Sequence, residues 1–135
     1  QGATGLNAGT NADATVYFID VPSNKLELWF WMESDRLLNA VFREFYSERD
    51  VVYEERRFSE SSPTGRLFLD WINSAYEAHP YGIGGVIGHA SDVKRLTMDD
   101  AKTFFDKYYV GENMTVAVVG DVKFNEIKKL AEKLK

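Results

Sequence analysis

The chain has 135 residues, of which 44% are hydrophobic and 27% are charged, as in ordinary globular domains and unlike disordered or fibrous proteins. Its formal net charge of -5, with basic residues dispersed along the chain, argues against a nucleic-acid surface. The absence of cysteine excludes disulfides, cysteine-based zinc sites and thiol catalysis, and no apolar run approaches the roughly 20 residues of a membrane span.

The first third of the sequence predicts a loop, a strand and a helix. Residues 1–12 are rich in Gly, Ala, Thr and Asn, which is typical of a loop or an irregular edge. Residues 14–21 predict a strand, because they are β-branched and aromatic. Asn24 and Glu27 fit a capping arrangement before a helix over about 25–40, which is so apolar that we expect it to be largely buried.

Two more helices are predicted in the middle of the chain. Ser47 and Asp50 resemble a capping box, which predicts a helix that begins just before Glu48 and ends at about Ser59. Residues 66–78 predict a third helix from their apolar spacing.

The last third predicts a loop over 80–92, a helix, a short strand and a final helix. Thr97 and Asp100 have the spacing of a capping box for the first of these helices. Residues 115–120 are β-rich and predict a short buried strand. The closing helix carries apolar residues at helical spacing, namely Ile127, Leu130, Ala131 and Leu134.

This order of elements predicts an α+β fold without internal repeats, as a single partial domain over residues 1–135. Two strands do not form a stable sheet alone. We therefore expect the rest of the sheet to come from polypeptide outside these residues, or from a strand hidden near residues 5–10.

Two glutamates in the second predicted helix are the strongest candidate site. Glu48 and Glu55 are seven residues apart and return to within roughly 20° of one direction, on the stripe that also carries Val51, Val52 and Phe58. A carboxylate on an apolar stripe needs a cation, hydrogen bonds or a metal if it is buried. Two interpretations stay open: a metal ligand with a supporting carboxylate, or ordinary carboxylates that are either solvated or paired with a neighbouring arginine such as Arg49, Arg56 or Arg66.

Other candidate sites are weaker. His79 and His89 belong to no metal-binding pair and are interpreted as structural or loop histidines. The glycines of residues 82–88 lack the dinucleotide-binding spacing, and no G-x-S-x-G motif is present. The aromatic cluster over residues 29–31 is interpreted as core.

Five segments, taken together and in order, resemble the pitrilysin/insulinase zinc metallopeptidases, also called inverzincins, whose relatives include the mitochondrial processing peptidase. They are GLNAGTNADATVYF, ESDRLLN with FYSERDVVYEERR, HPYGIGGVIG, DVKRLTMDDAKTFFDKYY and NMTVAVVGDV. The resemblance implies part of a processing-peptidase-like metallohydrolase domain, with an antiparallel or mixed sheet and helices packed on one face.

The resemblance also implies a site. In that family the two histidines of H-x-x-E-H and a downstream glutamate hold Zn²⁺, and the glutamate of the motif activates water. Glu55 matches the downstream ligand, and Glu48 matches a residue that supports the site. The motif itself does not occur here, so we expect the metal-bearing N-terminal-type half without its first strands, with the general base upstream of Gln1 and no activity of its own.

Leu6, Asn7 and Ala8 match the family's edge strand, which pairs with the main chain of a bound peptide, whereas the alternative is an ordinary glycine-rich loop. The implied partners are a peptide substrate and a homologous second domain or subunit. A non-catalytic homologous half that closes the peptidase chamber is the alternative function. The compartment is open, and the resemblance suggests the bacterial periplasm.

Overall fold

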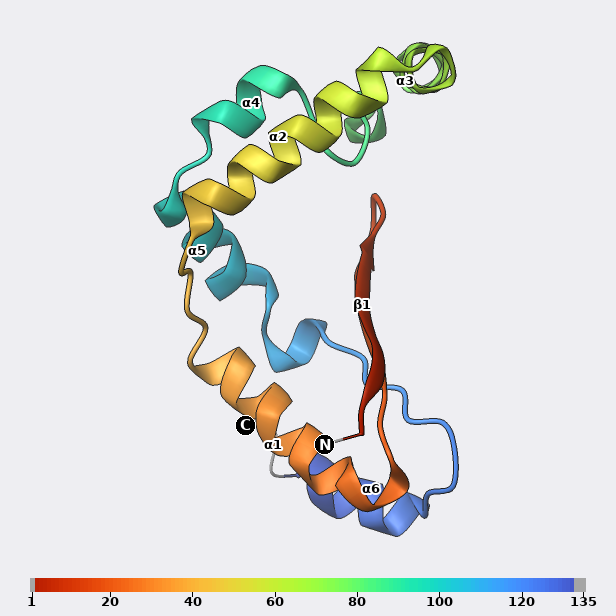
Figure 1. Cartoon of the computed structure of the whole chain (residues 1–135), viewed down its shortest axis with the longest axis vertical. Coiled ribbons are helices and arrows are strands. Elements are labelled where there is room, and N and C mark those ends of the chain that lie inside the picture. Colours follow the sequence, from red (N-terminus) through yellow and green to blue (C-terminus); the bar gives the residue numbers. More distant parts are fainter. Residues whose placement is uncertain (1, 133–135) are drawn as a thin grey trace. The chain divides into compact units, whose positions relative to one another are not determined.

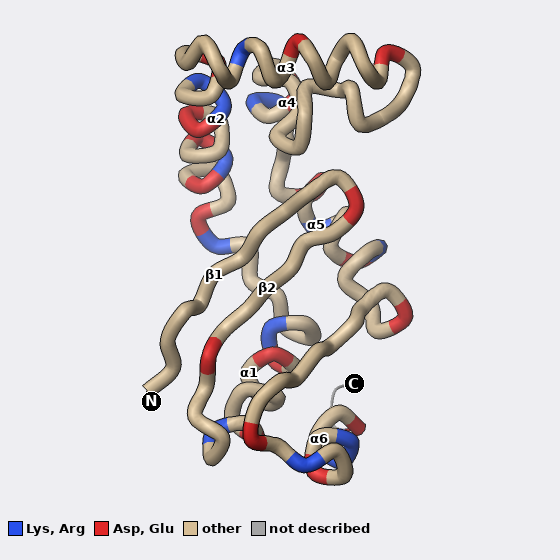
Figure 2. Tube along the Cα trace, turned by 90° about the vertical axis from the view of Figure 1, so that its right-hand side faces the viewer, with Lys and Arg blue, Asp and Glu red and all other residues tan. Residues whose placement is uncertain are grey.

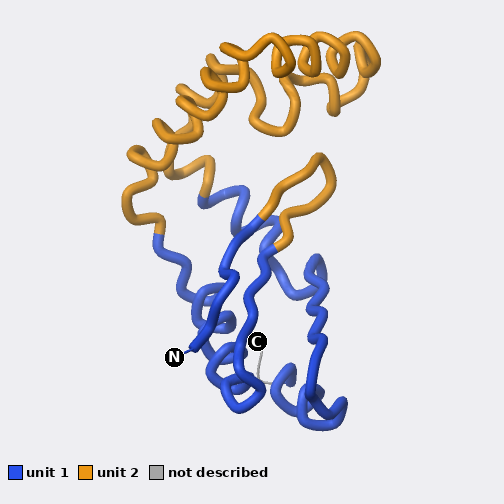
Figure 3. The backbone as a smooth tube through the Cα atoms, turned by 45° about the vertical axis from the view of Figure 1, so that its right-hand side comes forward, with its two compact units in different colours: residues 1–8, 17–41, 102–135 blue, residues 9–16, 42–101 orange. Residues whose placement is uncertain are grey.

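The structure is a computed structural model that describes residues 2–132. Within this range it contains one two-stranded antiparallel sheet and six α-helices (Figure 1), which confirms the predicted α+β class. The chain divides into two compact units (Figure 3). One comprises residues 1–8, 17–41 and 102–135, and the other comprises residues 9–16 and 42–101.

The two strands form a hairpin. Strand β2 (Thr15–Asp20) confirms the strand predicted over 14–21. Strand β1 (Thr4–Thr10) lies where a loop was expected, which confirms the hidden strand near residues 5–10. The sequence of β1 did not predict a strand, because Gly, Ala and Asn are poor strand formers. A strand of such residues forms only when a neighbouring strand pairs with it.

Helix α1 (Leu26–Leu38) confirms the helix predicted over 25–40. The expected cap is wrong, because Lys25 is the N-cap residue and makes no side-chain cap hydrogen bond. The expectation of a largely buried helix with an aromatic core cluster is also wrong for the described residues: Phe30 is buried, but Trp31 is 66% exposed.

The predicted strand over 115–120 does not form a strand in this structure. Residues 114–119 pair with no strand in the described part of the chain, although Met114 at their start has extended dihedrals (φ -117°, ψ 144°). A strand requires a hydrogen-bonded neighbour, which the sequence pattern alone does not supply. The final helix α6 (Phe124–Ala131) is confirmed and contacts α1, and Leu134 lies outside the described residues.

A tyrosine pair joins β2 to the end of helix α5 (Met98–Tyr108). The hydroxyls of Tyr17 and Tyr109 are 2.7 Å apart, and the ring of Tyr109 stacks on Phe105 at 4.6 Å between centroids. Burial, followed by the hydrogen bond with Tyr109, raises the pKa of Tyr17 to about 12. The Tyr17 hydroxyl therefore stays protonated at neutral pH.

The second unit is mainly helical. Helix α2 (Phe45–Ser61) confirms the second predicted helix but begins earlier, after Glu44, which has a φ of 59°. The predicted capping box at Ser47 and Asp50 is wrong, since both residues lie inside the helix.

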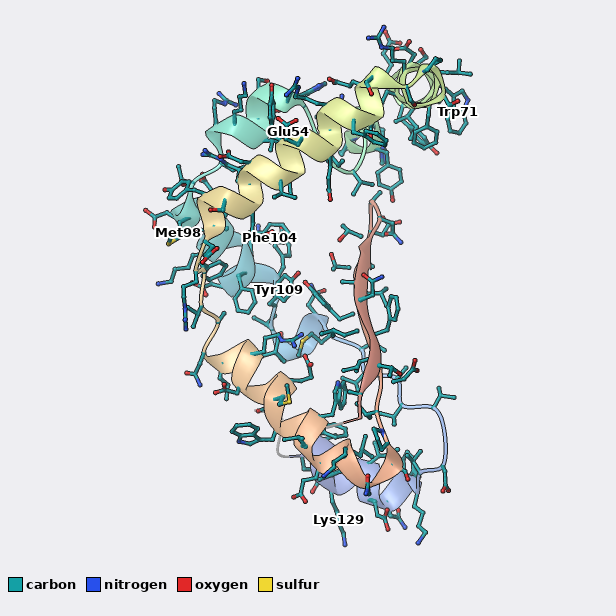
Figure 4. All side chains as sticks on the ribbon, viewed as in Figure 1. Glu54, Trp71, Met98, Phe104, Tyr109 and Lys129 are labelled. Atoms are coloured by element: carbon teal, nitrogen blue, oxygen red, sulfur yellow. The ribbon has the colours of Figure 1, made fainter. Side chains whose placement is uncertain are left out.

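Helix α3 (Pro63–Ala75) begins three residues before the predicted start at 66. Its N-terminus is set by Ser62, whose hydroxyl accepts a hydrogen bond from the Gly65 amide at 2.9 Å, and by proline at the first position. A Cβ on Gly65 would lie 2.0 Å from the Ser59 carbonyl oxygen, so the tight α2–α3 junction requires glycine there. Trp71 extends from α3 and is 59% exposed (Figure 4).

Helix α4 (Ala90–Arg95) occupies the end of the predicted 80–92 loop and packs on α2, with Val93 buried. The capping box of α5 is confirmed. The Asp100 carboxylate accepts hydrogen bonds from the Thr97 amide at 2.9 Å and the Thr97 hydroxyl at 2.6 Å. These bonds lower the pKa of Asp100.

Candidate functional site

Helix α2 has two faces of different character, and residues of both charges follow it along its length (Figure 2). With Glu48 as zero and about 100° per residue, Arg49, Tyr53, Arg56 and Glu60 fall between roughly 80° and 140°. This face is the less exposed one. Arg56 is only 6% exposed, and the other three residues are half-buried.

The opposite face carries both candidate carboxylates and is open to solvent. Glu48 and Glu55 are exposed, as are Val51 (53%) and Phe58 (78%) on the same stripe. The apolar residues of this stripe predict that it faces the protein's interior, but the described residues do not cover it. Helix α4 packs instead on the other face, where the Lys94 ammonium lies 4.2 Å from the centre of the Tyr53 ring.

The three arginines considered as partners for the carboxylates bind elsewhere. Arg49 donates from Nη1 to the Leu96 carbonyl at 3.1 Å. Arg56 donates from Nε to the Glu60 carboxylate at 2.8 Å, and Arg66 donates from Nε to the Glu60 carbonyl at 2.6 Å. The two carboxylates therefore do not pair with these arginines, whereas the alternative of solvated carboxylates agrees with their exposure.

The side chains of Glu48 and Glu55 make no hydrogen bond or ion pair with any residue between 2 and 132. Over the same residues no group of three or more His, Cys, Asp or Glu side chains could hold a metal ion. An exposed carboxylate without a partner fits the role of one Zn²⁺ ligand. The described residues supply no nitrogen ligands beside it.

The two histidines were interpreted as structural or loop residues, and both lie outside α2. His79 caps a short 3₁₀ helix (Pro80–Gly82), because its Nδ1 accepts a hydrogen bond from the Tyr81 amide at 3.3 Å. Its ring meets that of Tyr81 edge-on at 4.5 Å. His89 is the N-cap residue of α4.

Two contacts that the sequence analysis missed hold the glycine-rich loop. The Arg56 guanidinium donates from Nη1 to the Gly84 carbonyl, and the Tyr81 hydroxyl donates to the Asp13 carboxylate. The second bond raises the pKa of Tyr81. The four-residue spacing of Arg56 and Glu60 on a helix was a usable signal for their ion pair. Nothing in the sequence links residue 56 to residue 84 or residue 13 to residue 81.

The three residues expected to bind a peptide lie in the middle of β1. Leu6, Asn7 and Ala8 are all exposed, and the Asn7 side chain accepts a hydrogen bond from the Ala8 amide at 2.8 Å. Because the sheet has two strands, one edge of β1 is unpaired. The loop alternative for these residues is therefore wrong, and the edge is geometrically able to accept another strand.

The described helices include none that is both long and apolar enough to span a membrane.

Comparison with known proteins adds three findings. Residues 95–134 match the family model described as "Peptidase M16 inactive domain". The chain is 39% identical over 130 residues to "Zinc protease PqqE" of Helicobacter pylori, covering 94% of this chain and 29% of that protein. It is 30% identical over 132 residues to "Probable mitochondrial-processing peptidase subunit beta, mitochondrial" of Arabidopsis thaliana, covering 96% of this chain and 24% of that protein.

The fold has a counterpart among solved structures. The crystal structure of a protease from Helicobacter pylori superposes with a TM-score of 0.90 and 37% sequence identity, covering 98% of this chain and 32% of that one. The chain thus spans about a third or less of the length of these relatives. Similarity in sequence and fold over nearly all of these residues shows that the chain belongs to the M16 (pitrilysin/insulinase) peptidase family.

Proposed function

We propose that these residues are part of a zinc-dependent endopeptidase, in which Glu55 is a Zn²⁺ ligand and Glu48 supports the site. The observation that carries this proposal is the Glu55 carboxylate, which has no partner in residues 2–132 although the three nearby arginines are all bonded. Relatives over nearly the whole chain are named zinc proteases, which supports the same conclusion.

The exposed stripe around Glu55 gives the proposal a physical basis. Val51 and Phe58 would leave water if further polypeptide covered this face of α2. An ionised carboxylate covered in the same way requires a compensating cation. Histidine ligands on the covering segment, together with Glu55, would hold Zn²⁺.

Bound Zn²⁺ would polarise the scissile carbonyl and lower the pKa of a water ligand. The residues of this chain would perform two other tasks. Glu55 would fix the metal on a rigid helix, and Glu48, one heptad before it, would orient or electrostatically tune the site.

The unpaired edge of β1 supports a peptide substrate. An extended peptide would add to this edge through main-chain hydrogen bonds, and the small side chain of Ala8 would allow its backbone to approach. Such pairing recognises an extended conformation and depends little on the peptide's sequence.

A second candidate is a non-catalytic half that pairs with a catalytic domain or subunit. It is favoured by the match of residues 95–134 to a domain described as inactive. In this case the carboxylates of α2 would remain solvated, and the polypeptide would hold no zinc.

Peptidase activity before and after metal removal tests the proposal. A longer polypeptide that contains these residues and an H-x-x-E-H helix should cleave a quenched fluorescent peptide, lose activity with 1,10-phenanthroline and regain it with Zn²⁺. The 135-residue chain alone should be inactive, because it lacks the general base. Full activity after chelation would contradict the proposal, as would stoichiometric zinc and activity in the 135-residue chain.

A further inference from the structure

The glycine-rich loop of residues 80–88, which begins with a 3₁₀ turn, is tightly folded. The Gly82 amide donates a hydrogen bond to the His79 carbonyl at 3.0 Å. A Cβ on Gly84 would lie 2.6 Å from the carbonyl carbon of Gly88, and Gly84 has a φ of 67°, so this position leaves no room for a side chain. The loop is therefore folded closely on itself and can hold the groups that contact it in fixed positions.

Two elements are hydrogen-bonded to this loop. From α2, the Arg56 guanidinium, which is only 6% exposed, donates to the Gly84 carbonyl. From the loop, the Tyr81 hydroxyl donates to the carboxylate of Asp13, in the turn between β1 and β2. All four residues belong to the same compact unit. Within that unit the loop therefore connects the helix that carries the candidate carboxylates to the turn of the hairpin.

The donor of the contact with Asp13 is held in place by its neighbours. The ring of Tyr81 meets that of His79 edge-on at 4.5 Å between centroids, and that of Tyr76 at 5.6 Å. The Tyr81 amide donates to Nδ1 of His79, so the backbone is held as well as the ring. Because a ring that packs against two others has few rotamers open to it, the Tyr81 hydroxyl has a defined position.

The acceptor is fixed by the turn in which it lies. The side-chain oxygen of Asn11 accepts hydrogen bonds from the Asp13 amide at 2.8 Å and from the Ala14 amide at 2.9 Å. The Asn11 amide in turn donates to the Ala14 carbonyl at 2.9 Å. Such an Asx turn is a compact local structure. Strand β1 ends at Thr10, directly before this turn, so a contact made by Asp13 also holds that end of the strand.

We propose that the hydrogen bond between Tyr81 and Asp13 positions the edge of β1 for a peptide substrate, while Arg56 holds the loop on α2. Tyr81 and Asp13 are then positioning residues, which act through the strand and do not touch the peptide. Without their bond the end of β1 occupies more than one position, and an extended peptide that pairs with it has more conformational freedom to lose. The inference rests on the peptide-binding edge of the proposed function but does not depend on zinc.

Peptide binding to the longer polypeptide tests the inference, with a fluorescein-labelled peptide rich in threonine and valine, fluorescence anisotropy as the readout and EDTA present throughout. Tyr81→Phe should raise Kd by about 3- to 10-fold, the effect of one lost hydrogen bond. Asp13→Asn keeps an oxygen acceptor for the Tyr81 hydroxyl, so its Kd should stay near the wild-type value. Tyr76→Phe is the control, because the Tyr76 hydroxyl makes no hydrogen bond with residues 2–132. Equal Kd values for Tyr81→Phe and Tyr76→Phe would overturn the proposal.

A double-mutant cycle shows whether the two residues act through one bond. Asp13→Ala should weaken peptide binding as much as Tyr81→Phe, and the double variant should be no weaker than either single variant. Effects that multiply in the double variant would overturn the proposal. Zinc-dependent cleavage by the wild type together with equal Kd values in all variants would overturn this inference and leave the proposed function standing. The expected Kd pattern without zinc-dependent cleavage would do the reverse.

Discussion

Glu55 and Arg56 are neighbours in the sequence but lie in opposite environments. Arg56 is 6% exposed and bonded to Glu60 and Gly84, whereas Glu55 is exposed and has no partner among residues 2–132. The difference follows from the 100° step of a helix, which turns one side chain toward α4 and the glycine-rich loop and the next away from them. Sequence periodicity identified the stripe of Glu55 correctly but assigned the buried face to the wrong side of α2.

The buried guanidinium should contribute measurably to stability. Arg56→Met keeps an unbranched apolar stem but removes the guanidinium, so the Gly84 carbonyl loses its donor. We expect a loss of about 1–3 kcal/mol in the free energy of unfolding, measured by urea denaturation of the longest soluble polypeptide that contains these residues. Arg57→Met is the control, because Arg57 is exposed and pairs only with Glu54. If the two variants unfolded at the same urea concentration, the contacts of Arg56 would not be formed.

The capping carboxylate of α5 should make stability depend on pH. Hydrogen bonds from Thr97 lower the folded-state pKa of Asp100. The stabilisation that the ionised Asp100 gives to the folded state is therefore complete above the unfolded pKa of about 3.9, and it is lost as the pH falls through the folded-state pKa. Asp100→Asn should therefore lower the melting temperature at pH 7 and make little difference near pH 2. Asp99→Asn serves as a control. If Asp100→Asn lowered the melting temperature by the same amount at pH 7 and near pH 2, the capping role of Asp100 would be contradicted.

Among the secondary-structure elements, local signals predicted the helices well and the sheet poorly. The helix over 98–108 carries its own capping box, and the junction after Ser61 carries its own serine and proline, so short-range chemistry determined both. Strand β1 was predicted to be a loop, and the segment 115–119 was predicted to be a strand; both predictions are wrong. The first is a strand because β2 pairs with it despite its composition, and the second lacks a partner despite a favourable sequence.

The unpaired edge of β1 gives a prediction for substrate binding. The Ala8 amide donates to the Asn7 side chain, and a peptide would take the place of that acceptor. In the active longer polypeptide, Ala8→Pro removes this amide and should raise KM for a peptide substrate by about 3- to 10-fold, the effect of one lost hydrogen bond. The value of kcat should change less. Ala8→Ser keeps the amide and a small side chain, so its KM should stay near the wild-type value. If Ala8→Pro and Ala8→Ser gave the same KM, peptide pairing at this edge would be excluded.

Within residues 2–132, many large apolar side chains are exposed to solvent. Phe30 and Val93 are the apolar residues that the described part buries fully, whereas Trp71 and Val119 are 59% and 95% exposed. Soluble proteins rarely leave so many large apolar side chains in water. We infer that another protein surface covers these side chains.

The 135-residue chain should therefore bind the hydrophobic dye ANS strongly. We expect its fluorescence enhancement per molecule to exceed that of the longer polypeptide several-fold, because the stripe of α2 would be covered in the latter. Titration of both proteins with ANS at equal molar concentration checks this. Equal enhancement would show that the additional polypeptide does not cover these surfaces.

The central claim is that the Glu55 side chain holds zinc, and the zinc content of two matched variants tests it most directly. In the longer polypeptide, Glu55→Gln should lose most of its metal by atomic absorption. Glu54→Gln, one position earlier on α2 (Figure 4) and paired with Arg57, should keep about one zinc per molecule. Equal zinc content in the two variants would contradict the assignment of Glu55 as the ligand.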